Sequence, residues 1–102
     1  MNITQCKPFT PGEILKEEFM KPYALTQEAL ANLIGVTRRR INEIVAGKRS
    51  ITPDTACRLA RLFNMTPEFW LNLQIKTELW QEMHDNRKKR EYSAIIPLTM
   101  PR

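Results

Sequence analysis

The sequence predicts an all-α protein with one domain, and three observations support that class. The chain has 102 residues, which is enough for a single hydrophobic core. Threonine recurs just before runs of helix-forming residues, often with proline next to it, as at a helix N-terminus. Only residues 94–98 resemble a strand, and the sequence offers no second strand to pair with them. Pro97 also disfavours a central strand.

Each helix has a recognisable start and stop. The first opens on the capping box at residues 10–13 and must end before Pro22. Gly35 and Gly47 suit the C-terminal ends of the next two helices, where a left-handed residue is common. These signals predict five helices, at about residues 10–21, 26–34, 37–46, 52–63 and 66–86.

The chain divides into three parts around these helices. Residues 1–9 show no periodicity and are expected to form a leader. Residues 10–86 form the helical domain. Residues 87–102 follow as a basic segment and an extended tail. We interpret the basic run at 87–90 as a solvated helix end in preference to a second phosphate-binding patch.

Composition favours a polyanionic partner and argues against several classes of protein. The 16 Lys and Arg residues outnumber the 11 Asp and Glu residues, and the net charge of +5 favours nucleic acid. No apolar run is long enough for a membrane span and no secretory signal is recognisable, so we expect a cytoplasmic protein. Cys6 and Cys57 lack metal-ligand spacing and are expected to be reduced thiols, and His84 is the only histidine. We therefore expect no metal, no cofactor and no enzymatic activity.

Residues 26–46 have the pattern of a helix-turn-helix. A helix of about eight residues, a glycine-containing turn and a second helix from Thr37 match that motif. At 100° per residue, Ile41, Ile44 and Val45 share one side of the second helix and are expected to face the core. The opposite side is polar. A helix of this kind fits the major groove of DNA, with its N-terminal turns against the base edges.

The polar side supplies the predicted DNA contacts. Arginine can bridge O6 and N7 of guanine and asparagine can pair with adenine, so Arg38, Arg39 and Asn42 are predicted base contacts. Glu43 completes this set: it could accept a hydrogen bond from cytosine, or pair with Arg39 or Arg40 and orient it. The predicted phosphate contacts lie around the motif and are Gln27, Arg40, Lys48, Arg49 and Ser50.

The last predicted helix has apolar residues on two sides. One side must pack on the core, and the other needs a cover: a second copy, the apolar tail at residues 95–98, or a different protein. Because a helix-turn-helix reader commonly binds two half-sites about 34 Å apart, we favour a two-fold dimer. The residues predicted for the dimer interface are Phe69, Trp70, Leu71, Ile75, Leu79 and Trp80.

Two groups of motifs make the sequence resemble a known family. The run TQEALANLIGVTRRRINEIVAGKRSITPDTACRLARLF, followed by TPEFWLNLQ, resembles the XRE/Cro-like helix-turn-helix proteins, and more narrowly the HigA-type, VapI-related antitoxins. The stretch TPGEILKEEF at residues 10–19 fits the same branch. The helix-turn-helix part is common to many regulators, whereas PGEIL and TPEFWL are much more specific. The resemblance covers about residues 8–83.

The resemblance implies a five-helix, lambda-repressor-like fold that dimerises and represses its own operon by binding the operator. It also implies a protein partner, a HigB-type toxin that is a small RelE-like messenger-RNA endoribonuclease and is neutralised by the antitoxin. Carried over by position, Gln27 and the residues from Thr37 to Asn42 would contact the operator, which adds Thr37 to the base-contacting set. The toxin-binding surface does not carry over, because it varies among relatives.

Two alternatives stay open. A stand-alone repressor of phage or plasmid type would have the same recognition helix without a toxin. An adjacent toxin gene, or a small basic protein that co-purifies, separates these two interpretations. A protein-interaction module would use the same scaffold and the apolar last helix without reading DNA. Selective, salt-dependent DNA binding would exclude that third interpretation.

Overall fold

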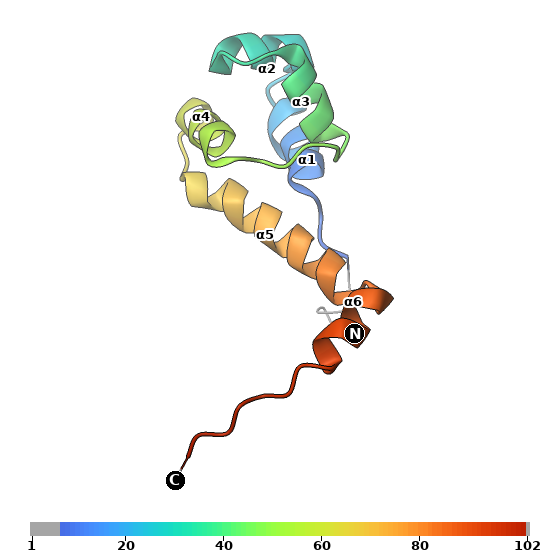
Figure 1. Ribbon diagram of the computed structural model, residues 1–102. Helices are drawn as coiled ribbons and strands as arrows, with labels where there is room; N and C mark the ends of the chain where they lie inside the picture. The colour runs from blue at the N-terminus through green and yellow to red at the C-terminus, as the bar shows by residue number, and fades with distance from the viewer. Residues whose placement is uncertain (1–6, 102) are drawn as a thin grey trace.

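The chain folds as a helical head from which one long helix leads away toward the C-terminus (Figure 1). The computed structural model describes residues 7–101. Its helices are α1 (Pro11–Ile14), α2 (Gln27–Ile34), α3 (Arg38–Val45), α4 (Pro53–Phe63), α5 (Pro67–Met83) and α6 (Asn86–Ser93), and the π-helical segment η2 (Leu15–Met20) directly continues α1. Residues 7–101 contain no strand, so the predicted all-α class is confirmed. In the same range, none of the helices is both long and apolar enough to cross a membrane.

Threonine caps start four of the helical units, as the sequence predicts. In each, the hydroxyl oxygen accepts a hydrogen bond from the backbone N–H three residues later, which satisfies one of the free donors of the first turn. The bonds join Thr10 to Glu13, Thr26 to Ala29, Thr37 to Arg40 and Thr52 to Thr55, at 3.1, 3.0, 3.1 and 3.4 Å. The helices α2 and α4 end at left-handed residues, Gly35 and Asn64.

The core lies where the helices of the head meet. Five helical units each contribute at least one fully buried apolar side chain: Leu15 from η2, Leu30 from α2, Ile41 from α3, Leu59 from α4 and Trp70 from α5. Because α5 takes part through Trp70, the long helix is anchored to the head at its N-terminal end.

Gly12 allows α1 to pass directly against α3. A Cβ atom at this position would lie 2.0 Å from the backbone carbonyl oxygen of Ile44, far inside any allowed contact. The glycine therefore sets the distance between the first helical unit and the C-terminal part of α3.

The C-terminal part differs from the prediction. The fifth helix ends at Met83, before the expected end near Asn86, and α6 occupies part of the segment expected to be basic and extended. The reason is local, because the Asp85 carboxylate accepts hydrogen bonds from the N–H groups of Arg87 and Lys88 at 2.9 and 3.2 Å and so starts a new helix. The basic run lies inside α6, and the extended tail begins only after it.

The position of Trp70 is a second correction. Its side chain is fully buried in this chain's own core, where its ring centre lies 5.0 Å from that of Phe19. The sequence predicted that Trp70 lies in a dimer interface. A side chain without accessible surface cannot contact a second copy, so Trp70 leaves that set. Periodicity shows that the last core helix is apolar on two sides, but it does not show which side faces inward.

Candidate nucleic-acid interface

The predicted helix-turn-helix is present as α2, a short turn and α3. The Val36 N–H donates to the Ala31 carbonyl oxygen at 3.0 Å across the turn. From α4, Arg58 Nη1 donates to the carbonyl oxygen of Ile34 at 2.8 Å, so the C-terminal end of α2 is held from a third helix. This role of Arg58 was not predicted, because a contact between residues so far apart in the chain leaves no periodic signal in the sequence.

Helix α3 presents its arginines and its asparagine to solvent. Ile41 and Ile44 are buried, as predicted. Arg38, Arg39 and Asn42 are exposed, and 85% of the Arg39 side chain is accessible. The predicted base contacts therefore lie together on the side of α3 that faces away from the core.

Gln27 and Asn42 join the two helices of the motif. The Asn42 Nδ2 atom donates to Gln27 Oε1 at 3.1 Å. Because Gln27 is the first residue of α2, its side chain lies beside the exposed side of α3. The bond restrains the Asn42 amide before any DNA contact, which reduces the side-chain ordering that binding would otherwise require.

Glu43 is an acceptor that two arginines share. Its Oε1 atom accepts hydrogen bonds from Arg39 Nε at 3.1 Å and from Arg49 Nη2 at 3.4 Å. Of the roles that the sequence leaves open for Glu43, the geometry favours pairing with Arg39. It also gives Glu43 a second partner, Arg49, which the sequence did not indicate. Exposed ion pairs contribute little to stability. The two pairs with Glu43 instead orient the guanidinium groups of Arg39 and Arg49 next to the outer side of α3.

Arg40 is directed toward α4. Its Nη1 atom donates to Asp54 Oδ2 at 3.1 Å, and Arg58 Nε donates to the same oxygen at 3.0 Å. The hydrogen bonds from Arg58 and then Arg40 stabilise the charged carboxylate and hold the pKa of Asp54 below its ordinary value. These ion pairs connect the N-terminal turns of α3 and α4.

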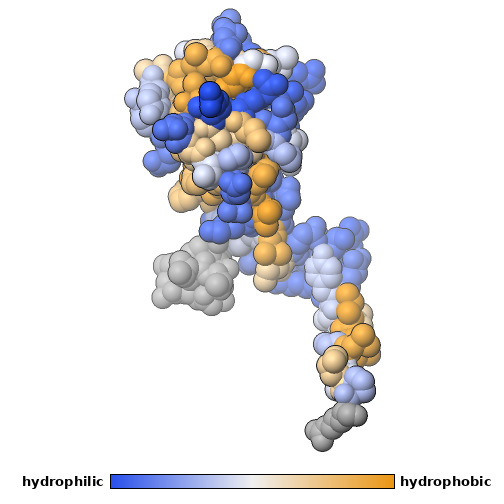
Figure 2. Space-filling view, turned by 90° about the vertical axis from the view of Figure 1, so that its left-hand side faces the viewer, coloured by the Kyte–Doolittle hydropathy of each residue, from blue (hydrophilic) through white to orange (hydrophobic). Residues whose placement is uncertain are grey.

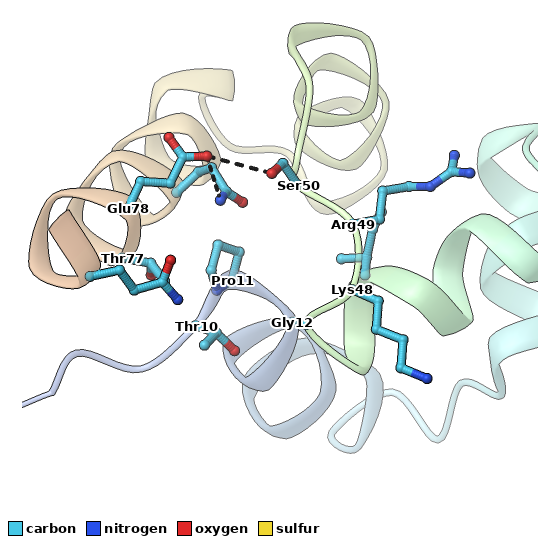
Figure 3. Close-up of a pocket in the computed structure, with 12 residues that line it drawn as sticks. Thr10, Pro11, Gly12, Lys48, Arg49, Ser50, Thr77 and Glu78 are labelled. Carbon is cyan, nitrogen blue, oxygen red and sulfur yellow. Dashed lines mark hydrogen bonds between the residues drawn. The ribbon is translucent and has the colours of Figure 1, made fainter. Parts of the chain in front are cut away.

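The loop after α3 carries the remaining predicted phosphate contacts. Lys48, Arg49 and Ser50 are exposed, whereas Ile51 is buried and anchors the loop in the core. In Figure 3 the side chains of Lys48 and Arg49 extend away from the cavity between the loop and α5. Their charged ends are therefore accessible from solvent, on the part of the head that directly follows α3.

Helix α5 carries a second kind of exposed surface. Ile75, Leu79 and Met83 are four residues apart and remain 59%, 56% and 56% exposed, so they form an apolar stripe along one side of the helix. Figure 2 shows an apolar column of this kind running down below the head. Ile96 and Leu98 of the tail are also exposed. Within the described residues, the tail therefore leaves the stripe uncovered.

The other members of the predicted dimer set lie elsewhere on α5. Phe69 borders the core and is only partly accessible, and Leu71 is partly buried. Trp80 is partly buried and stacks on His84, with ring centres 4.0 Å apart. The exposed stripe thus shares Ile75 and Leu79 with the predicted set.

Metal-ligating side chains do not gather in the described part of the chain. Within residues 7–101, no three His, Cys, Asp or Glu side chains lie close enough together to hold a metal ion. Cys57 is an exposed free thiol. Cys6 lies outside the described residues.

Known proteins share both the motif and the whole fold. The family model described as Helix-turn-helix matches residues 17–71. The chain is 46% identical over 89 residues to virulence-associated protein I of Dichelobacter nodosus, covering 87% of this chain and 80% of that protein. It is 38% identical over 98 residues to antitoxin HigA-1 of Vibrio cholerae, covering 96% and 90% respectively. A solved structure described as Pseudomonas aeruginosa antitoxin HigA with the higBA promoter is 38% identical, with a TM-score of 0.81 over 90% of this chain and 99% of that one.

Proposed function

The chain belongs to the HigA and VapI branch of the helix-turn-helix family, and from this we propose that it is an antitoxin that also represses its own operon. In this proposal it acts in the cytoplasm as a homodimer that binds a specific operator in double-stranded DNA. Its second partner is a HigB-like toxin, a messenger-RNA endoribonuclease, which it neutralises by direct binding. The chain itself is a binding protein and not an enzyme.

The observation that carries the DNA-binding role is the polar outer side of α3. Two exposed arginines and an exposed asparagine lie within the first five positions of a helix whose other side is buried. The N-terminal turns of a recognition helix are the part that reaches base edges in the major groove. The Pseudomonas HigA structure includes promoter DNA, and its 38% identity and shared fold support the same use of α3 here.

The proposed DNA contacts form two groups. Thr37, Arg38, Arg39 and Asn42 read base edges, and Glu43 keeps Arg39 oriented for that contact. The phosphate contacts position the protein on the duplex. They come from Gln27, Arg40, Lys48, Arg49 and Ser50. Arg40 makes its contact while it remains near Asp54, since a guanidinium group has five N–H donors.

The apolar stripe of Ile75, Leu79 and Met83 is the proposed contact with a second copy. Covering it removes apolar surface from water, which is favourable by about 25 cal/mol per Å². A two-fold axis beside α5 relates two α3 helices by the same symmetry that a palindromic operator has.

Fluorescence anisotropy tests this function. A labelled duplex from the DNA just upstream of the gene is compared with a scrambled duplex of the same composition at two salt concentrations. We expect selective binding, by about a thousandfold or more. Equal, strongly salt-dependent binding to both duplexes would show a basic surface without base readout at this site.

Co-expression with the product of the neighbouring gene tests the toxin partner. We expect a small basic protein to co-purify with the chain and to lose its ribonuclease activity in the complex. Operator binding without such a partner would indicate that the chain is a stand-alone repressor.

A further inference from the structure

Two side chains of α5, Gln74 and Glu78, hold the loop that follows α3. In Figure 3 a dashed line joins Glu78 to Ser50 of this loop. Gln74 Oε1 accepts a hydrogen bond from the backbone N–H of Ile51 at 3.0 Å, and Gln74 Nε2 donates to Glu78 Oε1 at 3.0 Å. The same Glu78 oxygen accepts from Ser50 Oγ at 3.5 Å. A chain of hydrogen bonds therefore joins α5 to the loop.

Ile51 is the point at which this loop enters the core. Its side chain is buried, and α4 begins only at Pro53, so its N–H group belongs to no helix. A backbone donor left unpaired beside the core is costly, and Gln74 supplies the acceptor. Glu78 fixes which way the Gln74 amide points, because only the NH₂ end of the amide can donate to a carboxylate.

The other end of the loop is held by α3. The backbone N–H groups of Lys48 and Arg49 donate to the Glu43 carbonyl oxygen at 2.8 and 3.2 Å. Gly47 has a φ of 76°, and this left-handed conformation lets the chain turn there. The backbone that carries Lys48 and Arg49 is thus fixed on one side by α3 and on the other by α5.

We propose that Gln74 is a positioning residue for DNA binding: it holds the loop so that Lys48 and Arg49 meet the phosphates without further ordering. Glu78 acts through Gln74 by fixing its amide. Gln74 and Glu78 directly precede Ile75 and Leu79 in the sequence. The helix that carries the proposed dimer surface therefore also sets the shape of the phosphate-contacting loop. This inference rests on the proposed operator binding.

Gln74→Met tests the proposal, because it keeps the length of the side chain and the charge of the protein but removes both hydrogen bonds. We expect affinity for the upstream duplex to fall about three- to tenfold, because only one of the two lost bonds, that to the Ile51 N–H, holds the loop directly, and one hydrogen bond contributes about that factor. We also expect the slope of log affinity against log salt to become shallower by about one for each phosphate that the loop no longer binds. Gln81→Met is the matched control, since Gln81 lines the same cavity but takes no part in these three bonds.

An exchange of the two side chains provides a rescue. The double variant Gln74→Glu with Glu78→Gln has the same net charge and can re-form all three hydrogen bonds. The new carboxylate at position 74 accepts from the Ile51 N–H and from the new amide NH₂ at position 78, and that NH₂ also donates to Ser50 Oγ. We expect it to recover the affinity and the salt slope of the unmodified chain, which Gln74→Met does not retain. Circular dichroism at the temperature of the binding assay establishes that each variant is folded.

A double-mutant cycle separates positioning from general destabilisation. In a Lys48→Ala, Arg49→Ala background, Gln74→Met should cost much less affinity than in the unmodified chain, because the side chains that it positions are already absent. Three results would overturn the proposal: an unchanged salt slope, a loss of affinity that adds fully to that of the loop variants, or a Gln74→Met variant that binds like Gln81→Met. If the unmodified chain does not prefer its upstream duplex, the proposed function fails and this inference fails with it.

Discussion

Helices α3 and α5 expose opposite kinds of surface, α3 on the head and α5 along the helix that leads away from it. The outer side of α3 carries Arg39 and Asn42, which Glu43 and Gln27 hold in place. The outer side of α5 carries an apolar stripe that nothing in the described residues covers. Charged side chains are stable in water and are available to a charged partner, whereas an apolar stripe gains free energy when it is covered. We therefore assign DNA to α3 and a protein partner to α5.

The inner side of α5 provides the largest expected effect. Trp70→Ala should lower the free energy of unfolding by about 3–5 kcal/mol, because it leaves a large cavity in the core. Urea denaturation followed by circular dichroism measures this loss. A loss below about 1 kcal/mol, together with weaker self-association, would show that Trp70 belongs to the dimer interface and not to the core.

The outer side of α5 should respond in the opposite way. Leu79→Glu places a charge in the exposed stripe, and because each dimer contains the change twice, we expect the dimer dissociation constant to rise at least about tenfold. The stability of the fold itself should change little, since Leu79 is 56% exposed. Sedimentation equilibrium measures the dissociation constant, and Lys76→Glu on an exposed position of α5 is the control. A Leu79→Glu variant that dimerises as well as Lys76→Glu would exclude the stripe as the interface.

The base-reading role of α3 is tested by Arg39→Ala. Removing a bidentate contact to guanine should cost about 1–3 kcal/mol on the operator and relax discrimination at one base pair. Anisotropy titrations with the upstream and scrambled duplexes give the ratio of affinities. An unchanged ratio would show that the reading surface lies elsewhere.

The loop should affect all DNA sequences alike. Lys48→Ala removes one predicted phosphate contact, so affinity should fall to the same extent on the upstream and scrambled duplexes. The salt slope should become shallower by about one. A loss confined to the upstream duplex would instead indicate that Lys48 reads bases.

The smallest effect concerns the ion pairs behind α3. Hydrogen bonds from Arg58 and Arg40 lower the pKa of Asp54 in the folded state below its ordinary value of 3.8. The unfolded chain then binds the proton more readily. The stabilisation by Asp54 is therefore present above that value and is lost as the pH falls through the folded-state pKa. Thermal unfolding between about pH 5 and pH 2 should show a shallower loss of stability in Asp54→Asn than in the unmodified chain. Parallel curves would mean that the ion pairs contribute nothing.

Helix starts were predictable from the sequence because a cap is a local interaction. Thr10, Thr26, Thr37 and Thr52 each bond to a backbone N–H three residues away, and the residue types that do this are few. The division of α3 into a buried and an exposed side also follows from its 3.6-residue period. The start of α6 is also a local signal, since Asp85 caps it, but the apolar periodicity of α5 gives no sign that one helix ends and another begins there.

Contacts between distant segments could not be predicted in the same way. Arg58 reaches the end of α2 from α4, and Gln74 reaches the loop from α5. Each depends on how helices pack, and no spacing in the sequence records it. The burial of Trp70 has the same cause, since periodicity cannot choose between two apolar sides of one helix.

The two surfaces are distinguished most directly by amide chemical shifts of the ¹⁵N-labelled chain. Titration with the upstream duplex should shift the signals of Arg38, Arg39, Asn42 and Lys48. It should leave those of Ile75 and Leu79 unchanged at a protein concentration where the dimer is already formed. Dilution without DNA should dissociate the dimer, so it should shift the signals of Ile75 and Leu79 and leave those of the α3 residues unchanged. Shifts on adding DNA that concentrate on α5, with α3 unaffected, would contradict the assignment of α3 to DNA.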